Sequence, residues 1–114
     1  MQYRTYKEAM LPRLVRLWKE EAVRIRYKAY DTPEEWKAEL LDKPDFDPEG
    51  CILAFTDSGS LAGFAAAISQ KEFLPGQNRD NTPGYIFLLV VKEEYEGRGV
   101  GSSLLERAEA FLKG

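Results

Sequence analysis

The sequence predicts an α+β fold in which a mostly antiparallel sheet is flanked by helices. Two observations support this class. Apolar residues recur at helical spacing near both ends of the chain, and strongly apolar segments of strand length lie between them. Hairpin-type connections join neighbouring strands, as antiparallel pairing allows, whereas parallel strands need a long crossover. The 114 residues are the size of a single domain, so we expect one unit over residues 1–114.

The first predicted elements are a short strand and an amphipathic helix. The strand is expected at Tyr3–Tyr6. The helix is expected to begin between Lys7 and Leu11, because Pro12 is tolerated only in a first turn. Its apolar stripe predicts packing on the core and consists of Leu11, Leu14, Val15, Trp18, Ala22 and Ile25.

A second helix has three start signals together. Thr32 is the predicted N-cap, Pro33 occupies the first helical position, and Glu35 stands three residues after the cap. Trp36 lies on the apolar stripe of this helix, as Trp18 does on the first. We therefore interpret both tryptophans as core residues rather than ligand-stacking ones.

The strands are predicted in the second half of the chain. Residues Cys51–Thr56 and Leu61–Phe73 read as two strands of a hairpin. A long polar loop, Leu74–Gly84, leads to seven consecutive apolar residues, Tyr85–Val91, which predict a central strand buried on both faces. A helix follows Gly101, with an apolar face made by Leu104, Leu105, Ala108, Phe111 and Leu112.

Composition excludes several kinds of site and partner. The net charge of −3 argues against a broad nucleic-acid surface, although a local phosphate pocket remains possible. The chain has no histidine and a single cysteine, Cys51, so neither a Cys/His zinc site nor a His-dependent nucleophile is available, and no metal is expected. Proton transfer would have to use a carboxylate, tyrosine, lysine or water.

The same features predict a soluble cytoplasmic protein. No apolar run approaches the roughly 18 residues of a membrane span, and residues Met1–Arg26 are too charged for a signal peptide. A single cysteine cannot form an internal disulfide, which suits a reducing compartment. Cys51 itself is expected to be a small buried apolar residue.

Three glycines mark the candidate site. Gly97, Gly99 and Gly101 lie between an apolar strand and a helix, where exposed backbone N–H groups can converge on a phosphate at the helix N-terminus. A plain tight turn is the alternative. A P-loop is excluded because no Gly-x-x-x-x-Gly-Lys-Ser/Thr occurs. A Rossmann site is disfavoured because its glycine loop follows the first strand and needs an acidic residue about 20 positions later.

The segment from Val91 to Gly101, VKEEYEGRGVG, followed by SSLLERA, resembles the sequence pattern of the GNAT superfamily of acyl-CoA N-acyltransferases. In that pattern a strand ends in valine, and Gln/Arg-x-x-Gly-x-Gly/Ala opens a helix. The order of the upstream elements is also similar to the superfamily. The resemblance implies a GNAT-like fold, acetyl-CoA as co-substrate, and transfer of the acetyl group to the amine of a small molecule or peptide by direct attack.

The resemblance also implies roles for particular backbone groups. A bulged strand would pair with the pantetheine arm through Leu89, Val90 and Val91, and the N–H near Leu89 would polarise the thioester carbonyl. The coenzyme A pyrophosphate would be held by backbone N–H groups at Arg98, Gly99, Val100, Gly101 and Ser102. Candidate acid-base residues flank the polar loop; they are Glu72 and Tyr85.

The chain departs from the superfamily pattern in two ways. Glu96 stands where Gln or Arg is usual, and it places an anion near the phosphates, which predicts weaker coenzyme binding. The strand, helix and closing hairpin that usually follow the glycine-loop helix are missing. We therefore expect a fragment or the first domain of a longer chain, or a homodimer that completes the sheet at the edge of Tyr85–Val91. The alternative function is a non-catalytic GNAT-like domain that binds coenzyme A or a protein partner.

Overall fold

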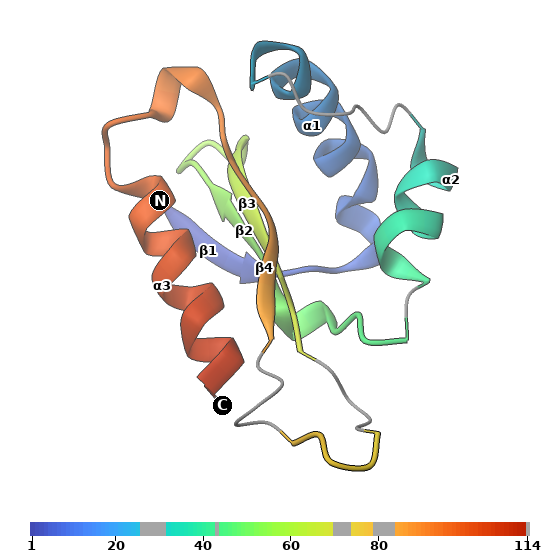
Figure 1. Ribbon diagram of the computed structural model, residues 1–114. Helices are drawn as coiled ribbons and strands as arrows, with labels where there is room; N and C mark the ends of the chain where they lie inside the picture. Colours follow the sequence, from blue (N-terminus) through green and yellow to red (C-terminus); the bar gives the residue numbers. More distant parts are fainter. Residues whose placement is uncertain (26–31, 43, 70–73, 79–83, 114) are drawn as a thin grey trace.

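The computed structural model describes residues 1–25, 32–42, 44–69, 74–78 and 84–113. In these residues one antiparallel sheet has the strand order β1-β2-β3-β4 (Figure 1). The strands are β1 (Gln2–Thr5), β2 (Cys51–Phe55), β3 (Leu61–Ile68) and β4 (Tyr85–Val91). Helices α1 (Leu11–Ile25) and α2 (Pro33–Trp36) cover one face, and α3 (Val100–Lys113) covers the other. The predicted α+β class is confirmed.

The predicted helix starts are also confirmed. A 3-10 turn, Glu8–Met10, precedes α1, so that Pro12 is the second residue of the helix, where its missing N–H costs no helical hydrogen bond. The Thr32 hydroxyl oxygen accepts the N–H of Glu35 at 3.2 Å, which caps α2 as predicted. No helix within the described ranges is long and apolar enough to cross a membrane.

The β2–β3 hairpin forms where the sequence predicts it. The Thr56 N–H donates to the Ser60 carbonyl at 2.8 Å, and Gly59 takes a φ of +86°, which favours glycine. Strand β3 ends at Ile68, earlier than the predicted Phe73; residues 70–73 lie outside the described part of the chain.

Each face of the sheet carries its own core. On the α1 face, Trp18, Trp36 and Phe64 are buried and meet edge to face, with ring centroids 5.8 to 6.4 Å apart. The prediction that both tryptophans are core residues is confirmed. On the α3 face the helix packs Val100, Leu104 and Ala108 against a sheet surface that includes Ile52 and three buried alanines, Ala54, Ala65 and Ala67.

The prediction that β4 is a central strand buried on both faces is wrong. Among the described residues β4 pairs only with β3, and Tyr85 and Leu89 remain 55% and 41% exposed. A run of seven apolar residues is typical of a strand that is buried on both faces. The run does not reveal, however, which segments of the chain lie beside the strand and cover its side chains. The strands buried on both faces are β2 and β3.

Cys51 is fully buried at the start of β2, as predicted, and burial raises the pKa of its thiol to about 12. Roughly one thiol in ten thousand is then ionised at pH 8, and the thiolate is the reactive form. We expect a disulfide reagent to label the native protein very slowly and the urea-unfolded protein at the rate of a free thiol. Rapid labelling of the native protein would contradict this burial.

Candidate functional site

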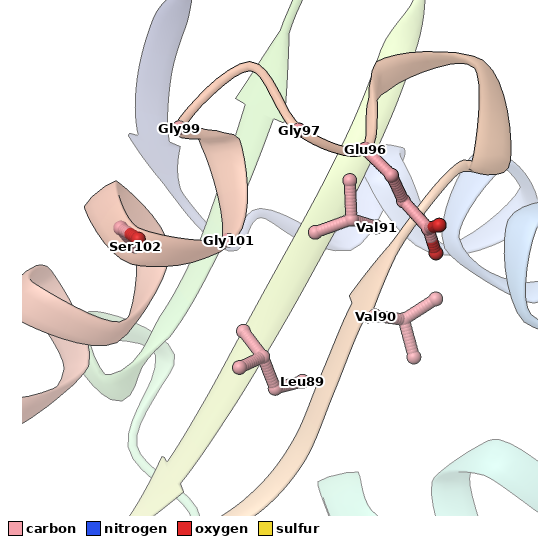
Figure 2. Close-up of a pocket in the computed structure, with 8 residues that line it drawn as sticks. All are labelled: Leu89, Val90, Val91, Glu96, Gly97, Gly99, Gly101 and Ser102. Atoms are coloured by element: carbon pink, nitrogen blue, oxygen red, sulfur yellow. The ribbon is translucent and has the colours of Figure 1, made fainter.

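A pocket of about 360 Å³ lies where β4 runs into the glycine loop and α3 (Figure 2). Three adjacent β4 residues, the loop and the first turn of α3 form its wall. The lining residues are Leu89, Val90, Val91, Glu96, Gly97, Gly99, Gly101 and Ser102. The pocket therefore brings together most of the predicted cofactor-binding residues. They come from the end of β4, from the loop and from the start of α3.

The backbone of β4 at Leu89 directs polar groups away from the neighbouring strand, on the side of this pocket. The N–H of Lys92 donates to the Ala62 carbonyl of β3 at 2.8 Å. Because successive residues of a strand direct their main-chain groups to alternate sides, Val90 faces β3, whereas Leu89 directs its main-chain groups to the side away from β3. The strand thus presents N–H and C=O groups that an extended ligand can pair with.

A bulge precedes these residues, as the resemblance implied. In the pairing with β3, Ala66 stands opposite Leu88 but Ala67 stands opposite Ile86, which leaves Phe87 as an extra residue on β4. A bulge bends its strand and disturbs the ladder locally. It lies just before the residues that line the pocket.

The glycine loop adopts a conformation that favours glycine. Gly97 and Gly99 have φ values of +77° and +82°, and open space surrounds the position of a Cβ at either residue. The Ser103 N–H donates to the Gly99 carbonyl at 3.0 Å, the first turn of α3. The N–H groups of Val100, Gly101 and Ser102 come before that bond, so they have no acceptor within the helix. Together with the positive end of the helix dipole they form an anion-binding geometry.

The charged residues around the loop are mixed in sign. Glu96 lines the pocket, and Figure 2 shows its side chain beside β4. The Lys92 ammonium lies 3.2 Å from the Glu94 carboxylate, and this hydrogen bond raises the pKa of Lys92. The Arg98 guanidinium lies 5.7 Å from the centre of the Tyr95 ring and is exposed. Of these two cations, Lys92 is thus paired with an acidic residue, and Arg98 lies near an aromatic ring.

Two of the predicted cofactor-binding residues do not line the pocket with the others. The Val100 side chain is buried in the core beneath α3, and Arg98 lies on the exposed outer side of the loop. Their predicted role concerns backbone N–H groups and remains a prediction. The Val100 burial has a separate consequence, because it holds the start of α3 against the sheet.

The predicted acid-base residues are not brought to the pocket. Tyr85 begins β4, about 13 Å along the strand from Leu89, and its side chain does not line the cavity. Glu72 lies outside the described residues. Within the described part of the chain no group of three potential metal ligands gathers.

Sequence reasoning missed Glu21. It is the only buried charged or polar side chain in the described part of the chain, 6% exposed, and its carboxylate accepts the N–H of Glu93 at 3.1 Å. A signal was present, since position 21 lies at helical spacing from Leu14, Trp18 and Ile25 on the apolar stripe. A carboxylate at such a position needs a buried partner.

Comparisons with known proteins agree with this geometry. Residues 11–114 match the model of the acetyltransferase (GNAT) family. No curated protein gives a significant sequence match. Among solved structures, a GNAT-family acetyltransferase from Staphylococcus aureus aligns with a TM-score of 0.71 at 16% identity, covering 98% of this chain and 66% of its own.

Two further solved structures carry more specific names. An aminoglycoside 6'-N-acetyltransferase from Acinetobacter baumannii has a TM-score of 0.68 at 17% identity, covering 98% of this chain and 71% of its own. An aminoglycoside N-acetyltransferase in complex with CoA has a TM-score of 0.65 at 19% identity, covering 98% and 70%. At these identities the likeness shows a shared fold, and the chain spans about two thirds of the relatives' length.

Proposed function

Because the chain belongs to the acetyltransferase (GNAT) family, we propose that it transfers an acetyl group from acetyl-CoA to a primary amine. One observation carries the proposal: the outward-facing main chain of Leu89 on β4 lines the same pocket as the start of α3, whose first N–H groups have no acceptor within the helix. An extended amide-containing arm attached to a diphosphate matches both parts of that wall.

Each part of the pocket has a separate role in this proposal. The Leu89 carbonyl, on the side of β4 away from β3, pairs with the pantetheine arm, as an added strand would. The N–H groups from Gly99 to Ser102, with that of Arg98, hold the pyrophosphate at the positive end of α3. In this proposal the thioester, at the end of the pantetheine arm, lies close to Leu89.

The chemistry is a direct attack with no covalent enzyme intermediate. The neutral amine nitrogen forms a bond to the acetyl carbon, and the Leu89 N–H stabilises the oxyanion that develops on the carbonyl. The carbon–sulfur bond then breaks, the thiolate leaves, and the nitrogen gives up its extra proton. The candidate acid-base residues are still Glu72 and Tyr85; because Tyr85 lies about 13 Å along β4 from Leu89, its proposed role is through water.

The acceptor is proposed only as a class, the primary amine of a small molecule or peptide. Two of the solved structures named above are aminoglycoside acetyltransferases, which makes aminoglycosides a reasonable first set of acceptors to test. A polyamine and a peptide with a free N-terminus complete the panel.

Two measurements test the function. Calorimetric titration should detect acetyl-CoA binding, and an absence of heat and thermal shift at millimolar ligand would overturn the proposal. Release of free coenzyme A thiol in the presence of the amine panel should then exceed hydrolysis without amine. Binding without amine-dependent thiol release would favour the non-catalytic alternative. The buried Cys51 thiol adds little background to a thiol assay.

Replacing Glu96 with glutamine should strengthen coenzyme A binding about three- to tenfold. A carboxylate about 4 Å from a phosphate costs roughly 1 kcal/mol in water and more where water is excluded, and about 1.4 kcal/mol is a factor of ten. Calorimetry of Glu96→Gln against the unmodified chain measures the change, which should shrink as salt is added.

Glu109→Gln is the matched control for this change. Glu109 is an exposed residue of α3 about 13 Å beyond Val100, farther than the screening length of about 8 Å at physiological salt. It should leave the affinity unchanged. Equal effects of the two variants would show that net charge, rather than the position of Glu96, controls binding.

A further inference from the structure

The buried carboxylate of Glu21 lies on the opposite face of the sheet from α3, yet it contacts the segment that leads into the glycine loop. Its partner, the Glu93 N–H, is 72 residues away in the sequence and 3.1 Å away in space. The contact therefore ties α1 to the start of the turn after β4.

Glu93 occupies a position where an external acceptor matters. It is the first residue of the 3-10 turn Glu93–Tyr95, whose N-cap, Lys92, makes no side-chain capping hydrogen bond. The first N–H groups of a helical turn have no acceptor inside it. Glu21 supplies that acceptor from another helix, and so replaces a local cap.

The hydrogen bonds of the 3-10 turn connect Glu93 to the loop that lines the pocket. The Glu93 carbonyl accepts the N–H of Glu96 at 3.1 Å, and the Lys92 carbonyl accepts the N–H of Tyr95 at 2.9 Å. Glu96 is the first loop residue that lines the pocket, followed by Gly97 and Gly99. Glu21 thus holds the N–H of Glu93, and the carbonyl of Glu93 in turn holds the N–H of Glu96.

We propose that Glu21 is a positioning residue that fixes the glycine loop for the diphosphate of coenzyme A. The inference rests on the proposed function of that loop. A leucine at position 21 would continue the apolar stripe of α1, so burial alone does not explain a carboxylate there. The anchored N–H gives the carboxylate a specific task at the cofactor site.

Two variants break the same contact from opposite sides. Glu21→Leu removes the acceptor. Glu93→Pro removes the donor, and proline fits there because Lys92 already has an extended φ of −61° and ψ of 137° and the first position of a helical turn tolerates it. Glu93→Gln controls for the lost charge of Glu93, and Glu20→Leu, at an exposed neighbour on α1, controls for the change on the helix.

The measurement compares coenzyme A with pantetheine, which lacks the diphosphate. Glu21→Leu and Glu93→Pro should each bind coenzyme A about tenfold more weakly than their controls, as expected for the loss of one hydrogen bond. Pantetheine binding, followed by NMR titration, should be unchanged because β4 is not moved. Glu21→Gln, whose amide oxygen can still accept, should retain most of the affinity.

The outcomes separate this inference from the function on which it rests. Failure of the unmodified chain to bind coenzyme A would overturn the proposed function. Normal coenzyme A binding by Glu93→Pro, or an equal loss for both ligands, would overturn the positioning role of Glu21. Since Glu93→Pro leaves α1 intact, the test stands even where Glu21→Leu does not fold.

Discussion

Gly99→Ala is expected to weaken coenzyme A binding about five- to thirtyfold while leaving the global fold intact. Gly99 has a φ of +82°, and an L-residue pays roughly 1–2 kcal/mol to adopt the left-handed region. The added methyl group meets no atom within 4 Å, so a steric clash within the protein does not contribute. Calorimetric titration with coenzyme A measures the loss.

The loop converts this strain into weaker binding because it is exposed and can relax. An alanine variant can rotate away from positive φ without disturbing the core, since Gly97, Arg98 and Gly99 are all exposed. Relaxation moves the N–H groups that converge on the pocket. The ligand must then restore the strained geometry when it binds, and the free energy needed for this lowers the affinity.

Gly59→Ala is the matched control. Gly59 has nearly the same φ, +86°, also faces open space, and lies in the β2–β3 turn, outside the pocket lining. We expect it to leave coenzyme A affinity unchanged. Equal losses in the two variants would mean that strain anywhere in the chain weakens binding, and no loss in either would mean that the loop geometry does not hold the ligand.

Local chemistry explains why much of the fold could be predicted. Thr32 and Pro33 are start signals that act within one turn, and the residues around Gly59 specify a hairpin by their own backbone preferences. The exposure of β4 could not be predicted in the same way. Whether Leu89 is covered depends on which segment lies beside its strand, and an apolar run of seven residues is compatible with either answer.

In the candidate site, too, the local features could be predicted and the long-range contact could not. The glycine spacing predicts the loop because the backbone has positive φ at Gly97 and Gly99, and glycine adopts positive φ without steric cost whatever its neighbours are. The contact between Glu21 and Glu93 joins residues 72 apart, and no local pattern identifies the partner of a buried carboxylate. The sequence could reveal only that Glu21 is out of place on an apolar stripe.

Trp18→Ala is expected to lower the free energy of unfolding by about 3–5 kcal/mol, the usual cost of removing a large buried aromatic side chain. Trp18 is fully buried and contacts both Trp36 and Phe64 edge to face. The three rings belong to α1, α2 and β3, so removing the Trp18 ring loosens the contact of both helices with this face of the sheet. Urea denaturation followed by circular dichroism measures the change.

The size of this effect has a direct consequence for the fold. A domain of this length has a total stability of about 5–15 kcal/mol, so the variant loses a large share of it. Leu74→Ala, at an exposed apolar residue, is the control and should change stability by less than about 0.5 kcal/mol. A loss below about 1 kcal/mol for Trp18→Ala would mean that the aromatic cluster is not a tightly packed core, because removing a tryptophan side chain from a packed core leaves a cavity that destabilises the fold by more than this.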